Sequence, residues 1–271
     1  MKLIVIFLSA VFLALFSPAP APDPDEPEIP TREVLIATPE IDGELDESYL
    51  SSFRYALPKG ENLNYAPNRA EAEQRMANTE GTAYYLYDNE YLYSCVVITD
   101  ETIMSRGEEW RYETTWPWND DGAELYFGFS ADHMFAIHTD AMGIRSVVDE
   151  KIWGTNHSTA KKYHDTPKAD YAVSRPDDVT YIIEIRVALD EGMGAGDELG
   201  LFLEIDDRYS ETGTGALFPA NRDPMNEAYI VTLSQKSADP SAYTEDELAQ
   251  AKAFTEYAFS RFIGILNGAK E

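Results

Sequence analysis

The residues best suited to chemistry are tryptophans in a polar loop and a glutamate in the apolar run that follows. Trp110, Trp116 and Trp118 lie within residues 101–119, and Glu124 stands in the run Ala-Glu-Leu-Tyr-Phe. An aromatic ring can cover the C–H face of a sugar ring, and a fixed carboxylate can bond the hydroxyls at its rim. Because a buried carboxylate is costly unless it is bonded, Glu124 faces either a polar cleft or solvent. The alternative for each tryptophan is packing in a core.

Aspartates in expected turns form a second set of candidates. Asp42, Asp46, Asp206 and Asp207 carry hard oxygen ligands of the kind that Ca²⁺ takes in proteins. No EF-hand spacing occurs, and each of these aspartates could instead cap a turn. We expect calcium as a structural cofactor, with Asp42, Asp206 and Asp207 as its candidate ligands.

Enzymatic motifs are missing from the sequence. It contains no His-Glu-x-x-His, no Gly-x-Ser-x-Gly and no phosphate-binding loop, and its histidines are too scattered for a zinc site. A glycosidase needs two facing carboxylates, but in a chain this rich in acids some pair is always available. The sequence therefore favours a protein that is not an enzyme.

The charge balance is strongly acidic. The 271 residues include 49 Asp and Glu against 21 Lys and Arg, which gives a formal net charge of -28. So much negative charge repels nucleic-acid phosphates and anionic lipid, so both are set aside as partners. The charge suits a neutral ligand or cations. With the single cysteine Cys95 in an expected buried strand, no intramolecular disulfide can form, and Cys95 is expected to be a small core hydrophobe.

The N-terminus has the form of an export signal. Lys2 is followed by an apolar run from residue 3 to 16 and by a small-residue segment, so residues 1–21 are expected to be a signal peptide. Pro22 is unfavourable just after a cleavage site, so an uncleaved anchor stays open. Residues 22–33 are rich in proline and acid and are expected to be an extended linker. The protein is expected to be secreted or extracytoplasmic.

The remaining chain has the pattern of an all-β domain. Two aromatic and β-branched runs, residues 82–87 and 91–99, flank an Asp-Asn-Glu turn and predict a β-hairpin. Short runs of the same kind recur, with Gly, Pro and Asp turns and no alternation with helices. Further strands are expected near residues 33–37, 120–130, 134–139, 145–148, 170–174, 180–188, 199–206 and 229–234. The fold class expected is a two-sheet antiparallel β-sandwich, jelly-roll or immunoglobulin-like, over residues 34–235.

The C-terminal segment breaks this pattern. Thr244 and Glu247 form a capping box, and apolar residues then recur at helical spacing up to Gly268. An amphipathic helix is expected over residues 243–268. It could lie against the sandwich, or it could dock a partner or a second copy of the chain.

Four segments in order resemble a known family. They are Ile41-Asp-Gly-Glu-Leu-Asp46, Leu86-Tyr-Asp-Asn-Glu-Tyr-Leu-Tyr93 with Thr99-Asp100, Trp118-Asn-Asp-Asp-Gly-Ala-Glu124, and Tyr181-Ile-Ile-Glu-Ile-Arg-Val187 with Gly200 and Asp206-Asp207. Together they resemble the family 9 carbohydrate-binding modules, part of the wider DOMON-like group. The resemblance implies a β-sandwich that binds sugar without catalysis, often beside enzymes that degrade polysaccharide, and that carries structural calcium.

The resemblance also implies roles for single residues. Trp118 matches a platform tryptophan, and Glu124 matches the carboxylate that bonds sugar hydroxyls. His138 falls where the family often has an amide that contacts sugar. Asn221, just before Arg222, stands where a second tryptophan is expected, so only half of a two-tryptophan clamp is present. The site expected is therefore Trp116, Trp118, Glu124, His138, Asn221 and Arg222.

The leading hypothesis is a secreted, non-catalytic protein that binds neutral sugar or polysaccharide ends. One alternative is a haem-binding DOMON-like electron-transfer module with Met134, Met142 or His138 as axial ligands. Another is an assembly protein that uses the sandwich as scaffold and the C-terminal helix for self-association.

Overall fold

A computed structural model describes residues 32–57, 63–65, 69–105, 119–130, 133–143, 146–151, 169–211, 213–217 and 229–238. The expected signal peptide, nearly all of the linker and the C-terminal helix lie outside these residues. So do Trp116, Trp118, Asn221 and Arg222 of the expected sugar site. These predictions therefore stay predictions. In the described part of the chain, no helix is long and apolar enough to cross a membrane.

Strands dominate the described chain. They are β1 (Glu33–Ile36), β2 (Arg54–Leu57), β3 (Leu63–Tyr65), β4 (Glu80–Tyr87), β5 (Tyr91–Thr99), β6 (Gly122–Ser130), β7 (His133–Asp140), β8 (Ser146–Lys151), β9 (Ala169–Ser174), β10 (Thr180–Ala188), β11 (Glu198–Asp207), β12 (Gly215–Leu217) and β13 (Tyr229–Ser237). The helical elements are the short 3₁₀ helix η2 (Glu47–Ser51) and α2 (Arg69–Arg75). The prediction of a mostly-β fold is confirmed.

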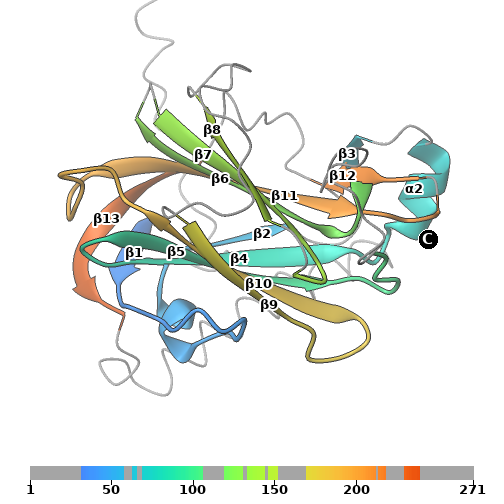
Figure 1. The fold of residues 1–271 in the computed structure, drawn as a ribbon, viewed down its shortest axis with the longest axis horizontal. Coiled ribbons are helices and arrows are strands. Elements are labelled where there is room, and N and C mark those ends of the chain that lie inside the picture. The colour runs from blue at the N-terminus through green and yellow to red at the C-terminus, as the bar shows by residue number, and fades with distance from the viewer. Residues whose placement is uncertain are drawn as a thin grey trace, which may run out of the picture.

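The strands form one continuous curled sheet. Its order is β8-β7-β6-β11-β13-β1-β4-β5-β10-β9, with β2, β12 and β3 paired off this path. We call β8, β7, β6 and β11 the β6 half, and β4, β5, β10 and β9 the β5 half. In Figure 1 the two halves lie one above the other, and β13 and β1 join them. The expected division into two separate sheets is therefore not found among the described strands.

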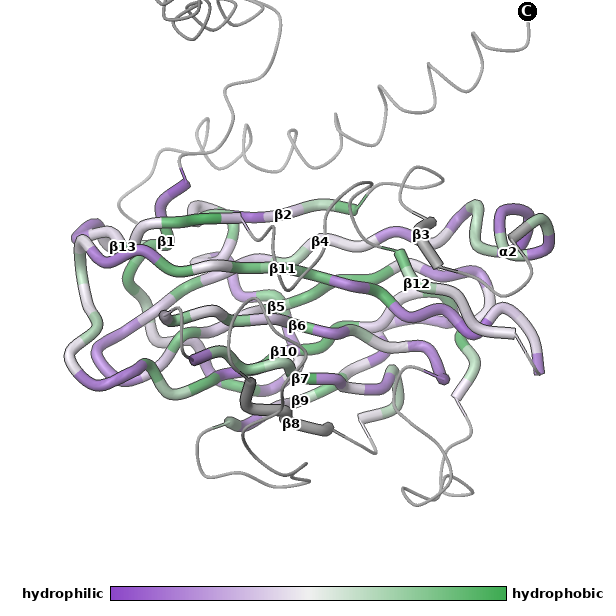
Figure 2. The backbone as a smooth tube through the Cα atoms, turned by 90° about the horizontal axis from the view of Figure 1, so that it is seen from above, coloured by the Kyte–Doolittle hydropathy of each residue, from purple (hydrophilic) through white to green (hydrophobic). Residues whose placement is uncertain are grey.

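The main hydrophobic core lies between the two halves. Leu125, Ile137 and Leu203 come from the β6 half, and Tyr85 and Ile183 come from the β5 half. These residues alternate with outward ones because successive side chains of a strand point to opposite faces. Figure 2 shows the hydrophobic stretches within the strands and the hydrophilic turns at the two ends of the molecule.

Each half also buries residues on its outer face. Outside the β5 half, Tyr49 of η2 packs in a cluster with Tyr93 and Cys95. Outside the β6 half, a smaller cluster contains Tyr126 and Phe202 together with Met134 and Ala136. Cys95 is fully buried, as expected, and burial raises its thiol pKa well above the usual value. The outer faces are thus partly covered surfaces, on which polar groups need bonded partners.

The predicted hairpin is confirmed as β4 and β5, which pair antiparallel over their whole length. Asp88 fixes the turn, since its Oδ1 accepts from the backbone N–H groups of Glu90 at 2.8 Å and Tyr91 at 2.9 Å. Its Oδ2 accepts from the hydroxyls of Tyr93 at 2.5 Å and Thr38 at 2.9 Å. An aspartate turn between two strand-forming runs is a local feature, which is why the sequence predicts it well.

Two expectations about strands were wrong. The sheet is not wholly antiparallel, because β1 pairs parallel with both β13 and β4. These neighbours are far from β1 in the sequence, so no tight turn forces an antiparallel pairing. The strands β2, β3 and β12 were missed because three or four residues are too few to show an alternating pattern.

Candidate functional site

Two of the expected sugar-contacting residues lie side by side on the outer face of the β6 half. Glu124 of β6 is directly opposite His138 of β7 in the sheet register. His138 Nδ1 lies 2.7 Å from Glu124 Oε1. Both side chains are almost buried, with exposed fractions of 7% for Glu124 and 5% for His138. The pairing places a carboxylate and an imidazole side by side at one fixed position on this outer face.

Further polar groups surround this pair. The Tyr126 hydroxyl donates to Glu124 Oε2 at 2.5 Å. On the other side of β6, Glu204 of β11 stands opposite Glu124. The carboxylates of Glu124, Glu204 and Asp206 offer oxygens that all lie within 4.8 Å of one another. We call Glu124, His138, Tyr126, Glu204 and Asp206 the β6 polar cluster.

The electrostatics of the β6 polar cluster follow from burial and crowding. Burial raises the pKa of Asp206 well above its usual value, and the neighbouring charges of Glu124 and Glu204 raise it further. Burial and then the Glu124 charge likewise raise the pKa of the Tyr126 hydroxyl. The cluster thus gathers several carboxylate oxygens in one place, and such oxygens can accept hydrogen bonds from the hydroxyl groups of an uncharged ligand.

Asp42 lies elsewhere and has a structural role. Its Oδ1 accepts from the Glu44 backbone N–H at 2.8 Å, which caps the local turn. The carboxylate of Glu184 on β10 accepts from the backbone N–H groups of Asp42 at 3.0 Å and Gly43 at 3.1 Å. Gly43 has a φ of +82°, which favours glycine, and a Cβ there would lie 3.0 Å from the backbone N of Ser174. Asp42 is thus not brought together with Asp206 and Asp207.

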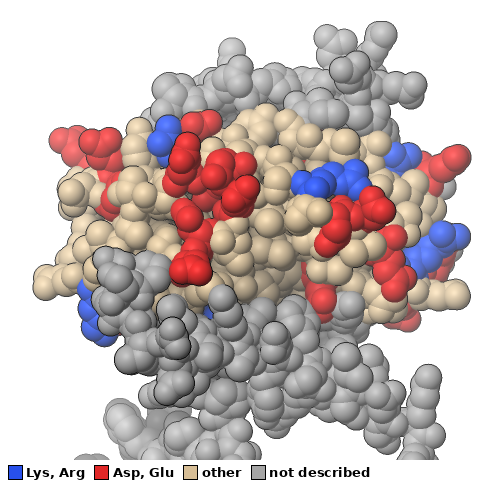
Figure 3. Space-filling view, turned by 90° about the horizontal axis from the view of Figure 1, so that it is seen from below, with Lys and Arg blue, Asp and Glu red and all other residues tan. Residues whose placement is uncertain are grey.

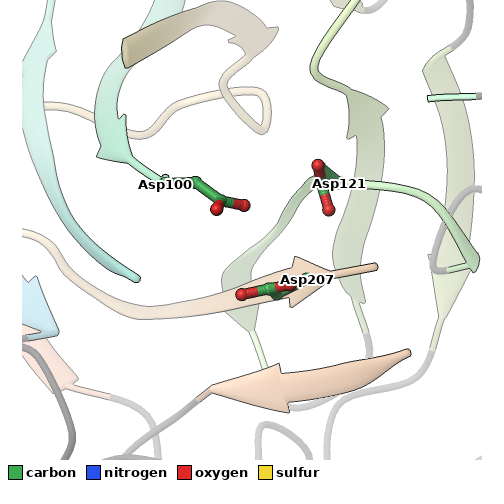
Figure 4. A group of neighbouring side chains, drawn as sticks. All are labelled: Asp100, Asp121 and Asp207. Carbon is green, nitrogen blue, oxygen red and sulfur yellow. The ribbon is translucent and has the colours of Figure 1, made fainter. Parts of the chain in front are cut away.

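Asp207 belongs to another group of carboxylates. Although it is the neighbour of Asp206 in β11, its side chain lies with those of Asp100 and Asp121. Figure 4 shows the three side chains turned toward one another from the ends of different strands. We call Asp100, Asp121 and Asp207 the aspartate triad. All three are buried, with exposed fractions of 4%, 0% and 2%.

Sequence reasoning missed Asp100 and Asp121 as candidate metal ligands. Asp100 directly follows β5, and Asp121 directly precedes β6. The sequence shows that both residues lie at strand ends. Whether the end of β5 and the start of β6 lie close to the end of β11 depends on the order in which the strands pair. No local spacing could have predicted it.

The alternative haem ligands gain no support from the geometry. His138 lies against Glu124, and Met142 is exposed in the turn after β7, with its sulfur 3.3 Å from Arg175 Nη1. Met134 is fully buried in the small cluster on the outer face of the β6 half.

Comparisons with known proteins agree with this architecture. A search of curated proteins found no match. A solved carbohydrate-binding module of family 9 from Caldicellulosiruptor kristjanssonii, in complex with cellotriose, is similar with a TM-score of 0.51 and 14% identity, over 78% of this chain and 97% of that one. A solved family 9 module from the same organism, in complex with glucose, is similar with a TM-score of 0.51 and 14% identity, over 76% of this chain and 96% of that one.

A family model matches most of the chain. The model described as "Carbohydrate family 9 binding domain-like" covers residues 41–235, from the Ile41-Asp-Gly turn to β13. This match confirms the family that the four sequence segments resemble. The chain therefore belongs to the carbohydrate family 9 binding domain-like family.

Proposed function

We propose that this protein binds neutral carbohydrate without catalysis, on the outer face of the β6 half. The observation that carries the proposal is the Glu124–His138 pair, at 2.7 Å on adjacent strands. These are the residues for which the family resemblance implies contacts to sugar hydroxyls. Two nearly buried polar groups held in register would form the floor of a site, while the tryptophans of the preceding loop would supply its aromatic platform.

The charge of the molecule supports a neutral ligand. Figure 3 shows Asp and Glu side chains gathered in clusters over one face, with Lys and Arg in smaller separate patches. An anionic ligand would be repelled by this surface and by the carboxylates of the β6 polar cluster. A sugar brings hydroxyl donors and no charge, so it can bond those carboxylates without adding to the repulsion.

Family 9 membership supports a binding module rather than an enzyme. In this proposal Trp118 and Trp116 cover the sugar face, and Asn221 and Arg222 complete the rim. Export through residues 1–21 is part of the same proposal, because the N-terminus has the form of a signal peptide. N-terminal sequencing of the protein recovered from its own host would test the export and the position of cleavage.

Calorimetry with glucose, cellotriose and other neutral mono- and oligosaccharides tests the binding. We expect measurable heat that Trp118→Ala abolishes and a loss of at least about tenfold in affinity for Glu124→Gln, equivalent to about 1.4 kcal/mol. Glu90→Gln is the matched control, because Glu90 is exposed in the β4–β5 turn and should leave affinity unchanged. A broad panel of neutral sugars without any binding heat would overturn the proposal.

A further inference from the structure

The loop that carries three of the tryptophans has a fixed base. Trp110, Trp116 and Trp118 all lie in sequence between Met104 and Asp121. The backbone N–H of Met104 donates to Asp121 Oδ2, and the backbone N–H of Asp121 donates to the Met104 carbonyl at 3.1 Å. These reciprocal bonds hold the two ends of the loop side by side. We call residues 104 and 119–121 the loop base.

Asp121 also attaches the loop base to the strands on both sides of β6. Its Oδ1 accepts from the backbone N–H of Arg208 at 2.5 Å. Its carbonyl accepts from the backbone N–H of Ala141 at 2.8 Å. Arg208 directly follows β11 and Ala141 directly follows β7, and these strands are the two neighbours of β6 in the sheet. The start of β6 is therefore held by both neighbouring strands.

The side chain of Arg208 adds a second attachment, to the residue before Asp121. Its Nη1 lies 3.2 Å from Asp120 Oδ1. Its Nη2 donates to the Glu211 carbonyl at 2.9 Å, and its Nε donates to the Ser210 carbonyl at 3.3 Å. All three guanidinium nitrogens are thus bonded, and because the group is planar, the three bonds fix its orientation. Asp120 is in this way tied to the turn that follows β11.

The pair between Arg208 and Asp120 is buried. The Asp120 side chain is 1% exposed and that of Arg208 is 12% exposed. A carboxylate in such a place is costly unless it is paired, so Asp120 is held where the guanidinium can reach it. Buried ion pairs often add little net stability to a fold, because the loss of water offsets the attraction. The local geometry that the pair fixes is then its main contribution.

Asp120 stands between the two kinds of residue that the proposed sugar site needs. Trp118 precedes it by two residues, and Glu124 follows it by four. The backbone direction at Asp120 therefore influences where residue 118 lies relative to the floor formed by Glu124 and His138. A binding group that is already held in place loses less freedom when the ligand binds, and this difference appears as affinity.

We propose that Arg208 is a positioning residue for sugar binding, which fixes the loop base so that Trp118 is presented to the floor of the site. Arg208 acts through Asp120 and Asp121 and not by contact with the sugar. The inference rests on the proposed function, since it needs a sugar that Trp118 and Glu124 contact.

Calorimetry on Arg208→Gln tests the positioning role, with the panel of neutral sugars used for wild type, glucose and cellotriose included. Glutamine keeps part of the side-chain stem but lacks the charge and the three-nitrogen fork. We expect the affinity to fall by about three- to tenfold, because ordering the loop base is added to the cost of binding. Arg208→Lys keeps the charge without the planar fork, so its affinity should lie between those of wild type and Arg208→Gln.

The double variant Asp120→Asn/Arg208→Gln separates positioning from the burial of charge. It removes both charges together, so neither is left unpaired, and it should melt closer to wild type than Arg208→Gln does. It still lacks the guanidinium fork, so its sugar affinity should remain about three- to tenfold weaker than that of wild type. A pair that only stabilises the fold would instead regain full affinity in the double variant.

Tryptophan fluorescence gives a readout that is independent of global stability. Well below the melting temperature, acrylamide should quench the tryptophans of Arg208→Gln more strongly than those of wild type, because the loop base opens more often. Saturating sugar should reduce this difference, since it holds Trp118 in place. A pair that only stabilises the fold would leave the quenching of folded protein unchanged.

Arg186→Gln is the matched control. Arg186 of β10 pairs with Asp170 of β9 at 3.1 Å in the β5 half, outside the proposed sugar site, so affinity and quenching should remain as in wild type. The inference alone is overturned if wild type binds sugar and Arg208→Gln binds it equally tightly, or if Arg186→Gln loses as much affinity as Arg208→Gln. A wild type that binds no sugar of the panel would overturn the proposed function and this inference with it.

Discussion

Glu124 and Glu184 make an instructive comparison, because each stands in the middle of an apolar strand and each is buried on an outer face. Glu184 in the β5 half accepts hydrogen bonds from neutral donors, namely the Asp42 and Gly43 N–H groups and the Tyr49 hydroxyl, the last at 2.9 Å. Glu124 in the β6 half has His138, Tyr126 and two further carboxylates around it.

The difference lies in what each carboxylate does for its neighbours. Glu184 satisfies backbone groups of the Ile41-Asp-Gly turn, so it fixes a loop that is more than a hundred residues away in sequence. Glu124 sits among other acids, so removing its charge relieves repulsion. Similar local sequences thus build a structural anchor in one half and a candidate ligand-binding floor in the other.

The largest expected effect is that of Glu184→Ala on stability. The substitution leaves two backbone donors and the Tyr49 hydroxyl without an acceptor in a buried site, so unfolding free energy should fall by about 3–5 kcal/mol. Urea denaturation measures the loss. Glu184→Gln keeps an acceptor and the side-chain shape, so it should lose clearly less. A loss below about 1 kcal/mol for the alanine variant would contradict the anchor role.

The pH dependence of stability extends the comparison to Asp88, the carboxylate of the β4–β5 turn. Asp88 is partly exposed. Its partial burial raises the pKa of its carboxyl group, but hydrogen bonds from Tyr93, Glu90, Tyr91 and Thr38 outweigh this effect and lower the pKa below 3.8. A carboxyl group whose pKa is lowered in the folded state stabilises the fold at pH values above its unfolded-state pKa. This contribution is lost as the pH falls through the folded-state pKa.

Asp88→Asn should therefore cost about 1–2 kcal/mol at neutral pH, and the difference from wild type should shrink as the pH falls from about 5 toward 3. Denaturation curves at several pH values measure it. A difference that stays constant over this range would show that the charge of Asp88 does not stabilise the turn.

Glu124→Gln should have a smaller effect on stability than Glu184→Ala or Asp88→Asn. Losing the charge relieves repulsion with Glu204 and Asp206, while the amide oxygen still accepts from Tyr126, so unfolding free energy should change by less than about 1 kcal/mol in either direction. The same variant should lose sugar affinity. A large loss of stability would instead make Glu124 an anchor like Glu184 and remove the contrast between the two halves.

The smallest effect concerns Cys95, which lies opposite Glu184 in the β5–β10 pairing. Its burial, and the nearby charges of Glu184, Asp46 and Asp42, raise its thiol pKa well above 9.0. Native protein should thus resist thiol reagents, and Glu184→Ala should label faster because the covering turn opens more often. Equal labelling rates in Glu124→Gln and wild type provide the control. Rapid labelling of native wild type would contradict the buried thiol.

Much of the architecture followed from the sequence because it depends on local pattern. The β4–β5 hairpin, β10 and β11 appear as alternating or apolar runs bounded by turn residues, and their limits agree with the structure within a few residues. Cys95 is buried, as its place in an apolar strand predicted. The family motifs gave Glu124 and His138 as candidates for one site, and the two residues lie opposite each other on adjacent strands. The tryptophans, Asn221 and Arg222 remain predictions.

Tertiary structure alone decided which carboxylates meet. The sequence determined that acids stand at strand ends and within apolar strands, but neighbours such as Asp206 and Asp207 point to opposite faces and join different groups. It could not show that β1 runs parallel to β4 and β13, or that the ends of β5 and β11 approach the start of β6. Residues far apart in sequence come together only through the order in which the strands pair, and long-range packing sets that order rather than any local propensity.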